Sequence, residues 1–265
     1  MNGMEKRMLE ILKELKSDCN VLAIKAEFEA EGSRTDELVK LNEIVFRADL
    51  DVYIKIGGCE AVRDLDECRI LGATGIMAPM IETPFAMSKF IGAIQKVYSA
   101  EEQAEIKFII NAETITCYNN IDAIFAVKDI GTIHSIAVGR VDLSGSLGYS
   151  RDMINSEEIY NLALVFLQKA KAKGIMAGMG GGISMESIPF MRRLGDNLEK
   201  FETRKVVFKN DANLNYERCI LLAMEFEILY LKNKQALYTI MANEDVTRIG
   251  MMEKRFALLK SQYSK

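Results

Sequence analysis

Short apolar runs with strand character alternate with amphipathic helical stretches along the first 210 residues. Strands are predicted over 20–29, 52–56, 74–79, 106–113, 133–139, 174–179 and 204–208, and helices over 34–48, 60–72, 85–99 and 156–174. This alternation predicts a parallel sheet, and its repetition favours an α/β fold of the closed TIM-type (β/α) barrel over an open sheet. About seven strands are predicted where such a barrel has about eight, so we expect an irregular early strand or an incomplete barrel.

The pattern changes after residue 210. The segment "LNYERCILLAMEFEILYLKNKQALYTIM" is a long, strongly apolar helical run, and "EDVTRIGMMEKRFALLKSQ" follows it. Such a helix is seldom left facing water, because its apolar side chains gain free energy on burial. We therefore expect a barrel domain over 1–210 and a helical extension over 211–265. The extension would pack on the barrel, on a second subunit of a homo-oligomer, or on both.

Composition excludes several classes of function. The net charge of -4 and the interspersed charges of both signs argue against a nucleic-acid partner. No stretch is apolar and long enough to cross a membrane, and the charged, helical N-terminus is not a signal peptide. The 5 cysteines include no CxxC pair, and His134 is the 1 histidine. We therefore expect reduced thiols in a cytoplasmic protein, no structural zinc site, and a packed core histidine.

Polar residues follow the ends of three predicted strands. Asn111 and Glu113 end one strand, Asp142 follows the next, and Lys55 precedes a pair of glycines. The carboxyl ends of barrel strands converge on one face, where two carboxylates suit a hard divalent ion such as Mg²⁺ or Mn²⁺. Such an ion polarises a carbonyl and stabilises a developing enolate. The alternative is a pair of solvated acids at the starts of loops.

The first predicted strand carries charges on one of its faces. Strand alternation in "IKAEFEAE" places Lys25, Glu27 and Glu29 on the same side. A charged face turned into a barrel is unfavourable without partners, and Lys55 is the nearest predicted partner. The alternative is an edge strand with one solvated face.

A glycine-rich loop follows the sixth predicted strand. Gly178, Gly180, Gly181 and Gly182 lie within "AGMGGGISMESIPFM". Glycines let a backbone approach a ligand closely, so Gly180 and Gly181 are candidates for binding a carboxylate or a phosphate. An ordinary flexible loop explains the same residues equally well.

Three motifs together resemble the HpcH/HpaI aldolase and citrate lyase β-subunit family. They are "IKIGGCEAVRDLDECRILGATGIMAPMIETPFAM", "INAET" and "VGRVDLSGSLG", and the likeness spans roughly residues 20–180. The resemblance implies a modified TIM barrel. It also implies metal-dependent aldol cleavage or condensation through a pyruvate or acetyl enolate.

The resemblance assigns roles to individual residues. Glu113 and Asp142 fall on the two metal ligands of the family, for Mg²⁺, Mn²⁺ or Co²⁺. Asn111 falls where many aldolases place a Gln near the metal, and Lys55 falls where the family has an Arg on the carbonyl oxygen. A cation beside the metal shares the negative charge of the enolate, although Lys is a point charge where Arg is a planar fork.

The same resemblance places a carboxylate-binding loop at Gly139, Arg140 and Val141, through their backbone. This chain also departs from the family, because "LAIKAEFEAEGSR" lacks the Asp and His that follow an early strand there. Proton transfer would then depend on Glu27, with Lys25, Glu29 or a metal-bound water as alternatives.

The expected function is that of a metal-dependent carbon–carbon lyase or aldolase. It would act on a small 2-oxo acid, with a sugar-like or phosphorylated acceptor. One alternative is a citramalyl- or malyl-thioester lyase using the same enolate chemistry, although no acyl-CoA-binding signal is found in the sequence. The other alternative is a barrel without catalysis that serves as a binding or scaffolding subunit.

Overall fold

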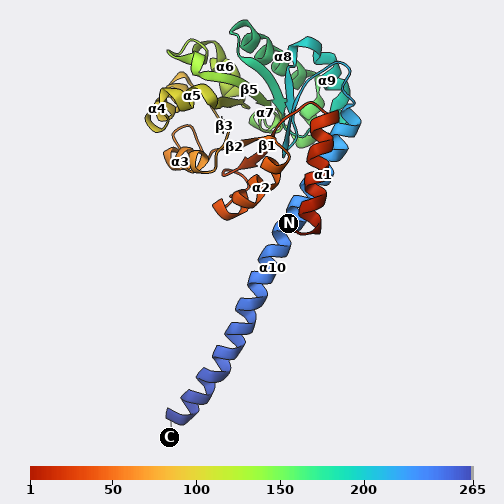
Figure 1. Ribbon diagram of the computed structural model, residues 1–265. Helices are drawn as coiled ribbons and strands as arrows, with labels where there is room; N and C mark the ends of the chain where they lie inside the picture. Colours follow the sequence, from red (N-terminus) through yellow and green to blue (C-terminus); the bar gives the residue numbers. More distant parts are fainter. Residues whose placement is uncertain (264–265) are drawn as a thin grey trace.

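Eight strands close into a barrel, with helices arranged around it (Figure 1). This computed structural model describes the backbone of residues 1–263, with side chains except those of 240–241, 244–245 and 255–263. The strands are β1 (Val21–Glu27), β2 (Asp51–Lys55), β3 (Gly75–Ala78), β4 (Lys107–Ala112), β5 (Ile133–Gly139), β6 (Met176–Gly180), β7 (Lys200–Glu202) and β8 (Val206–Lys209).

The α-helices are α1 (Gly3–Asp18), α2 (Thr35–Arg47), α3 (Val62–Ile70), α4 (Pro84–Val97), α5 (Ala100–Glu105), α6 (Ile115–Ile124), α7 (Arg140–Ser146), α8 (Glu157–Ala172), α9 (Ile188–Leu194) and α10 (Tyr216–Tyr263). Short 3₁₀ turns are η1 (Ile130–Thr132), η2 (Arg151–Asn155), η3 (Met185–Ser187) and η4 (Gly195–Asn197). Local sequence accounts for several helix ends. Asn2 and Glu5 form a capping box at α1, and Gly72 and Gly174 adopt the positive φ that follows α3 and α8.

The barrel is complete, so the expectation of an incomplete barrel is wrong, whereas the register of β1 against β8 is irregular between Val21 and Ala23. The strand that sequence reasoning missed is β7, which has only 3 residues and pairs in parallel with β6. The chain then turns at residues 203–205 and returns as β8, which is antiparallel to both β7 and β1. The β7–β8 turn therefore lies at the same rim as the carboxyl ends of β1 to β7.

Two groups of side chains form the core. Small and medium apolar residues, among them Ala23, Ile109 and Val207, fill the middle of the barrel, and a larger apolar cluster lies between the strands and the helices. Charged groups also lie inside the barrel. Lys25 contacts Glu202 at 2.6 Å, and Lys200 donates a hydrogen bond to Ser135 at 2.9 Å. The charged face of β1 thus turns inward, and the alternative of a solvated edge strand is wrong.

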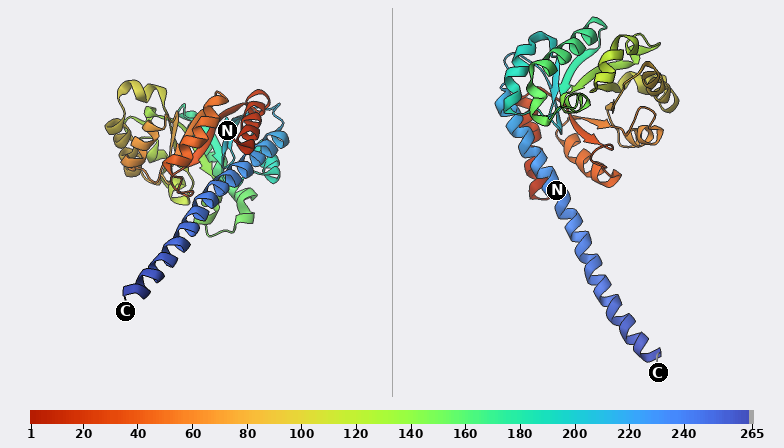
Figure 2. Two further views of the ribbon diagram at one scale, coloured as in Figure 1. Left: turned by 60° about the horizontal axis from the view of Figure 1, so that its bottom comes forward. Right: turned by 180° about the vertical axis from the view of Figure 1, so that it is seen from behind.

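The two predicted helical runs after residue 210 form one continuous helix, α10. Its first half lies along α1, where Arg7 contacts Glu225 at 2.9 Å and Asn2 donates to Asn233 at 2.7 Å. Its second half extends away from the barrel as an arm, which we define as residues 239–263 (Figures 1 and 2). Within the described residues, no helix combines the length and the apolar character that crossing a bilayer requires.

His134 was predicted to be a packed core residue, but the structure places it outside the core. It is the second residue of β5, at the amino end of the strand, and its side chain is exposed. All 5 cysteines are free thiols, and only Cys59 is not buried.

Candidate functional site

A hollow of about 430 Å³ opens at the carboxyl ends of the strands. It brings together residues from β1, β2, β4, β5, β6, β7 and the first half of α10. Every residue predicted for the site lines this hollow, with the exception of Arg140; they are Glu27, Lys55, Asn111, Glu113, Gly139, Val141, Asp142, Gly180 and Gly181. The convergence follows from the barrel topology, which places the ends of parallel strands on one face.

Glu113 is the most buried acid of the site, at 2% exposure. Its Oε1 accepts a hydrogen bond from the Met80 backbone N–H at 3.1 Å, and its Oε2 accepts one from Asn111 Nδ2 at 3.0 Å. Burial raises the pKa of Glu113, and the nearby charge of Asp142 adds to the rise, whereas Lys55 opposes it. The two carboxylates are therefore close enough to repel each other.

Asp142 differs from Glu113 in its environment. It lies in the first turn of α7 with an exposed side chain, so only one of the two predicted ligands is buried. Asn111 is 6% exposed, and no hydrogen-bond partner of its Oδ1 is found among the described residues. The site therefore offers two carboxylates and one amide oxygen without a partner.

These donors fit a hard divalent cation. Mg²⁺ is typically held by one or two carboxylates and keeps several water ligands, whereas an all-protein cage is unusual for it. No group of three His, Cys, Asp or Glu side chains arranged for a metal occurs within the residues that the structure describes. A cation would also relieve the repulsion between Glu113 and Asp142.

Lys55 provides a positive charge beside these acids. Its Nζ lies 2.8 Å from Glu29 Oε2 and 3.8 Å from Glu113 Oε1. Burial disfavours the charged amine, but Glu113, Glu29 and Glu27 outweigh burial and raise its pKa. Lys55 is thus a fixed ammonium at the site. Its ion pair with Glu29 confirms the prediction that Lys55 is a partner of the charged face that contains Glu29.

Glu27 ends β1 and is 6% exposed. The nearest cation to its carboxylate is Arg204 of the β7–β8 turn, at 3.7 Å. Lys25, two residues earlier, faces the same interior but pairs with Glu202 of β7. The first strand therefore brings one acid to the hollow next to a half-exposed guanidinium.

The glycine positions of the site reflect close packing. A Cβ on Gly139 would lie 2.6 Å from Glu113 Oε2, and a Cβ on Gly180 would lie 2.9 Å from Glu202 Cγ. Gly181 has a φ of +75°, and a Cβ there would meet the backbone nitrogens of Arg140 and Val141 at 2.6 and 2.8 Å. The loop after β6 thus lies directly against the start of α7, where the carboxylate-binding loop is expected.

The side chain of Arg140 points away from the hollow and is fully buried. It donates to the carbonyl oxygens of Gly180 and Gly181 at 3.3 and 3.0 Å and to Ser187 Oγ at 3.1 Å. Burial lowers its pKa to about 10. The Arg140 side chain therefore holds the loop after β6 in place and does not line the site. The sequence-based prediction for Arg140 was that its backbone binds the substrate carboxylate.

Further residues outside the predicted set contribute to the site. Met80 adopts a φ of 50°, unusual for a residue other than glycine, and this conformation directs its N–H to Glu113. Arg204 reaches the rim because β8 runs antiparallel. Met224 and Glu227 of α10 form part of the wall. The place of these residues in the site depends on contacts between distant segments.

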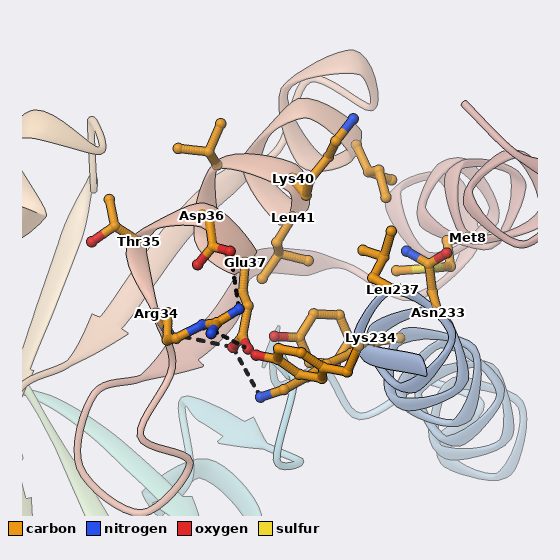
Figure 3. Close-up of a pocket in the computed structure, with 14 residues that line it drawn as sticks. Met8, Arg34, Thr35, Asp36, Glu37, Lys40, Leu41, Asn233, Lys234 and Leu237 are labelled. Carbon is orange, nitrogen blue, oxygen red and sulfur yellow. Dashed lines mark hydrogen bonds and ion pairs between the residues drawn. The ribbon is translucent and has the colours of Figure 1, made fainter. Parts of the chain in front are cut away.

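A larger hollow, of about 690 Å³, lies between α2 and α10 (Figure 3). Arg34, Glu37 and Lys234 lie along it with apolar side chains such as Leu41 and Leu237. Glu37 accepts from the Arg34 backbone N–H at 3.3 Å and pairs with Lys234 at 2.9 Å. Arg34, Glu37 and Lys234 are therefore paired with each other, and this hollow contains none of the predicted site residues.

Comparison with known proteins supports the interpretation of the barrel. The sequence model described as HpcH/HpaI aldolase/citrate lyase matches residues 40–180. A search of curated proteins finds no match.

Among solved structures, an HpcH/HpaI aldolase from Desulfitobacterium hafniense is 15% identical, with a TM-score of 0.58 over 74% of this chain and 82% of that one. The citrate synthase SbnG is 16% identical, with a TM-score of 0.59 over 90% of each chain. An HpcH/HpaI aldolase/citrate lyase family protein from Burkholderia cenocepacia is 15% identical, with a TM-score of 0.59 over 91% of this chain and 99% of that one. At these identities the likeness concerns the fold.

Proposed function

Because the chain belongs to the HpcH/HpaI aldolase/citrate lyase family, we propose that it is a divalent-metal-dependent carbon–carbon lyase or aldolase acting on a 2-oxo acid. Members of this family are generally divalent-metal dependent. The observation that carries the proposal is the meeting of Glu113, Asp142, Asn111 and Lys55 in one hollow. These residues supply hard oxygen donors and a cation at the place where charge would develop.

Glu113 and Asp142 would hold the divalent cation, with Asn111 Oδ1 as a further oxygen donor. When bound there, the cation would act as a Lewis acid on the keto oxygen of the substrate. The Lys55 ammonium would stabilise the enolate oxygen as negative charge develops on it. The loop of Gly139 and Val141, packed against Gly181, would receive the substrate carboxylate.

In the cleavage direction, a 4-hydroxy-2-oxo acid would lose the proton of its hydroxyl group. The carbon–carbon bond between C3 and C4 breaks, its electron pair passes into the enolate, and an aldehyde leaves. Glu27 is the acid placed to accept the hydroxyl proton and to return a proton to C3 of the enolate. The Arg204 guanidinium lies 3.7 Å from this carboxylate. The protons and electrons of this step therefore balance without a further co-reactant.

The thermal midpoint of unfolding tests the proposal. Wild type would be heated with EDTA, Mg²⁺, Mn²⁺ or Co²⁺, each with and without oxalate as a pyruvate-enolate mimic, and compared with Asp142→Asn. We expect a metal-dependent rise that increases with oxalate and disappears in the variant, because a ligand of the native state stabilises it by about 2.7 kcal/mol at 100 times its Kd. Asp66→Asn, at an exposed position on α3, serves as the matched control.

Two outcomes would favour the alternatives. No shift with any metal would contradict the proposal and favour a barrel that binds or scaffolds without catalysis. That alternative gains some support from the exposure of Asp142, since an exposed acid has no need of a cation to be stable in the fold. A metal shift together with turnover that requires a CoA thioester would indicate the citramalyl- or malyl-thioester lyase. Release of pyruvate from a 4-hydroxy-2-oxo acid would support the aldolase.

A further inference from the structure

Helix α10 has a second apolar face besides the one it buries. Cys219, Ile220, Ala223 and Phe226 are buried against the rest of the chain. Leu221, Met224, Ile228 and Leu231 lie on a different side of the helix and are between 48% and 58% exposed. Their spacing of three and four residues forms a continuous stripe along the helix, which is the pattern of a helix that packs against another helix.

The arm carries a second stripe in the same heptad register. Ile249 and Met252 are 56% and 58% exposed, and they continue the three-and-four spacing that starts at Leu221. The sequence places Phe256 and Leu259 at the next two positions of this repeat. In the sequence, these four positions mirror those of the first stripe about residue 240, since 221 matches 259, 224 matches 256, 228 matches 252 and 231 matches 249.

This symmetry fits one kind of partner. When two copies of the same helix pack antiparallel about residue 240, each stripe on one helix faces the other stripe on its partner. A two-fold axis produces such a self-complementary interface. We therefore propose that two copies of this chain associate through an antiparallel pairing of α10, centred on residue 240, in which each arm covers the exposed stripe Leu221–Leu231 of the other copy.

Of the two pairs of positions between the stripes, one is polar, since Gln235 lies opposite position 245 of the partner subunit, an Asp in the sequence, and the other fits this arrangement. In the antiparallel register Tyr238 faces Ala242 of the partner subunit, so that a large side chain meets a small one. The arm is about 37 Å long at 1.5 Å per residue, enough to reach the whole of the partner's stripe.

The pairing would extend to the functional site. Met224 belongs both to the exposed stripe and to the wall of the hollow that contains Glu113 and Asp142. The partner's arm would therefore run along the mouth of that hollow. The association itself is independent of the proposed function, because it is measured without substrate or metal.

Cysteine cross-linking tests the register and direction. Two copies of Thr239 approach each other at the two-fold axis, whereas two copies of Leu231 lie about 27 Å apart along the helices. We expect Thr239→Cys to form a disulfide-linked dimer under oxidation and Leu231→Cys to remain unlinked. The double variant Leu231→Cys, Ile249→Cys should link again, and wild type, with its 5 native cysteines, gives the background. Linking of Leu231→Cys alone would indicate a parallel pair and overturn the proposal.

Two adjacent methionines provide a matched pair for the second test. Met251 and Met252 are 57% and 58% exposed, but only Met252 lies on the stripe. We expect Met252→Glu to weaken association about tenfold or more, because it places a charge in an apolar interface, and to halve the mass measured by light scattering. Met251→Glu should leave the mass unchanged. Equal dissociation by both variants, or a wild type that is monomeric at all concentrations, would refute the pairing.

Discussion

Gly139 leaves no room for a side chain next to Glu113, because a Cβ there would lie 2.6 Å from Glu113 Oε2. We predict that Gly139→Ala displaces the Glu113 carboxylate and abolishes the metal-dependent rise in thermal midpoint. Overpacking should cost roughly 1–3 kcal/mol of stability in the absence of metal. Gly145→Ala in α7, where a Cβ would meet nothing within 4 Å, is the control and should retain the metal response. A full metal response in Gly139→Ala would show that Glu113 is not a ligand.

Lys55 is predicted to act on the developing enolate. Lys55→Met should lower kcat/KM roughly 10²- to 10³-fold at saturating metal, the usual effect of removing one group that stabilises an oxyanion. The metal-dependent rise in thermal midpoint should persist, since the oxygen donors remain. Lys55→Arg should recover part of the activity, because it restores the charge. If Lys55→Met retains wild-type kcat/KM, Lys55 has no catalytic role.

Arg140 is predicted to be a structural requirement of the loop after β6. Arg140→Lys should destabilise the protein by roughly 2–4 kcal/mol in urea unfolding, because an ammonium has three donors whereas the Arg140 guanidinium donates to five acceptors, the carbonyls of Gly180, Gly181 and Ile154, Asn155 Oδ1 and Ser187 Oγ. Arg151→Lys, at a nearby exposed position, should change stability by less than about 0.5 kcal/mol. Equal stabilities of the two variants would contradict this role.

Lys200 makes stability depend on pH. Burial inside the barrel lowers its pKa from 10.5 to about 8, so between these values the unfolded chain binds more protons than the folded one. Stability should therefore rise as the pH increases from about 8 to 10.5, as the burial penalty on the ammonium disappears. We predict that Lys200→Met is more stable than wild type at pH 7 by up to roughly 3 kcal/mol, at 1.36 kcal/mol for each pKa unit.

Urea unfolding at several pH values checks this prediction. The advantage of Lys200→Met should shrink steadily above pH 8, whereas Lys209→Met, at an exposed end of β8, should show no such trend. An advantage that is constant with pH would mean that lost packing or hydrogen bonding, and not titration of Lys200, causes the difference.

Strand and helix positions were largely predictable because they depend on local patterns. The runs at 20–29 and 106–113 became β1 and β4, and the helix over 156–174 became α8. By contrast, Lys200–Glu202 is too short to show strand periodicity, and no local pattern reveals that β8 runs antiparallel. Both features depend on pairing between strands, which an alternating pattern does not specify.

The sequence by itself determined the α/β class, the order of the elements and the set of polar residues at strand ends, because periodicity and turn chemistry are properties of neighbouring residues. Only the tertiary structure decided which of these residues meet. Closure of the barrel pairs Lys25 with Glu202, 177 positions away, and brings Arg204 to Glu27. It also buries Glu113 but leaves Asp142 exposed, and it leaves His134 outside the core. Such contacts depend on how distant parts of the chain are brought together. The free energy of each charged group then depends on its neighbouring charges and on its exposure to solvent, which only the tertiary structure sets.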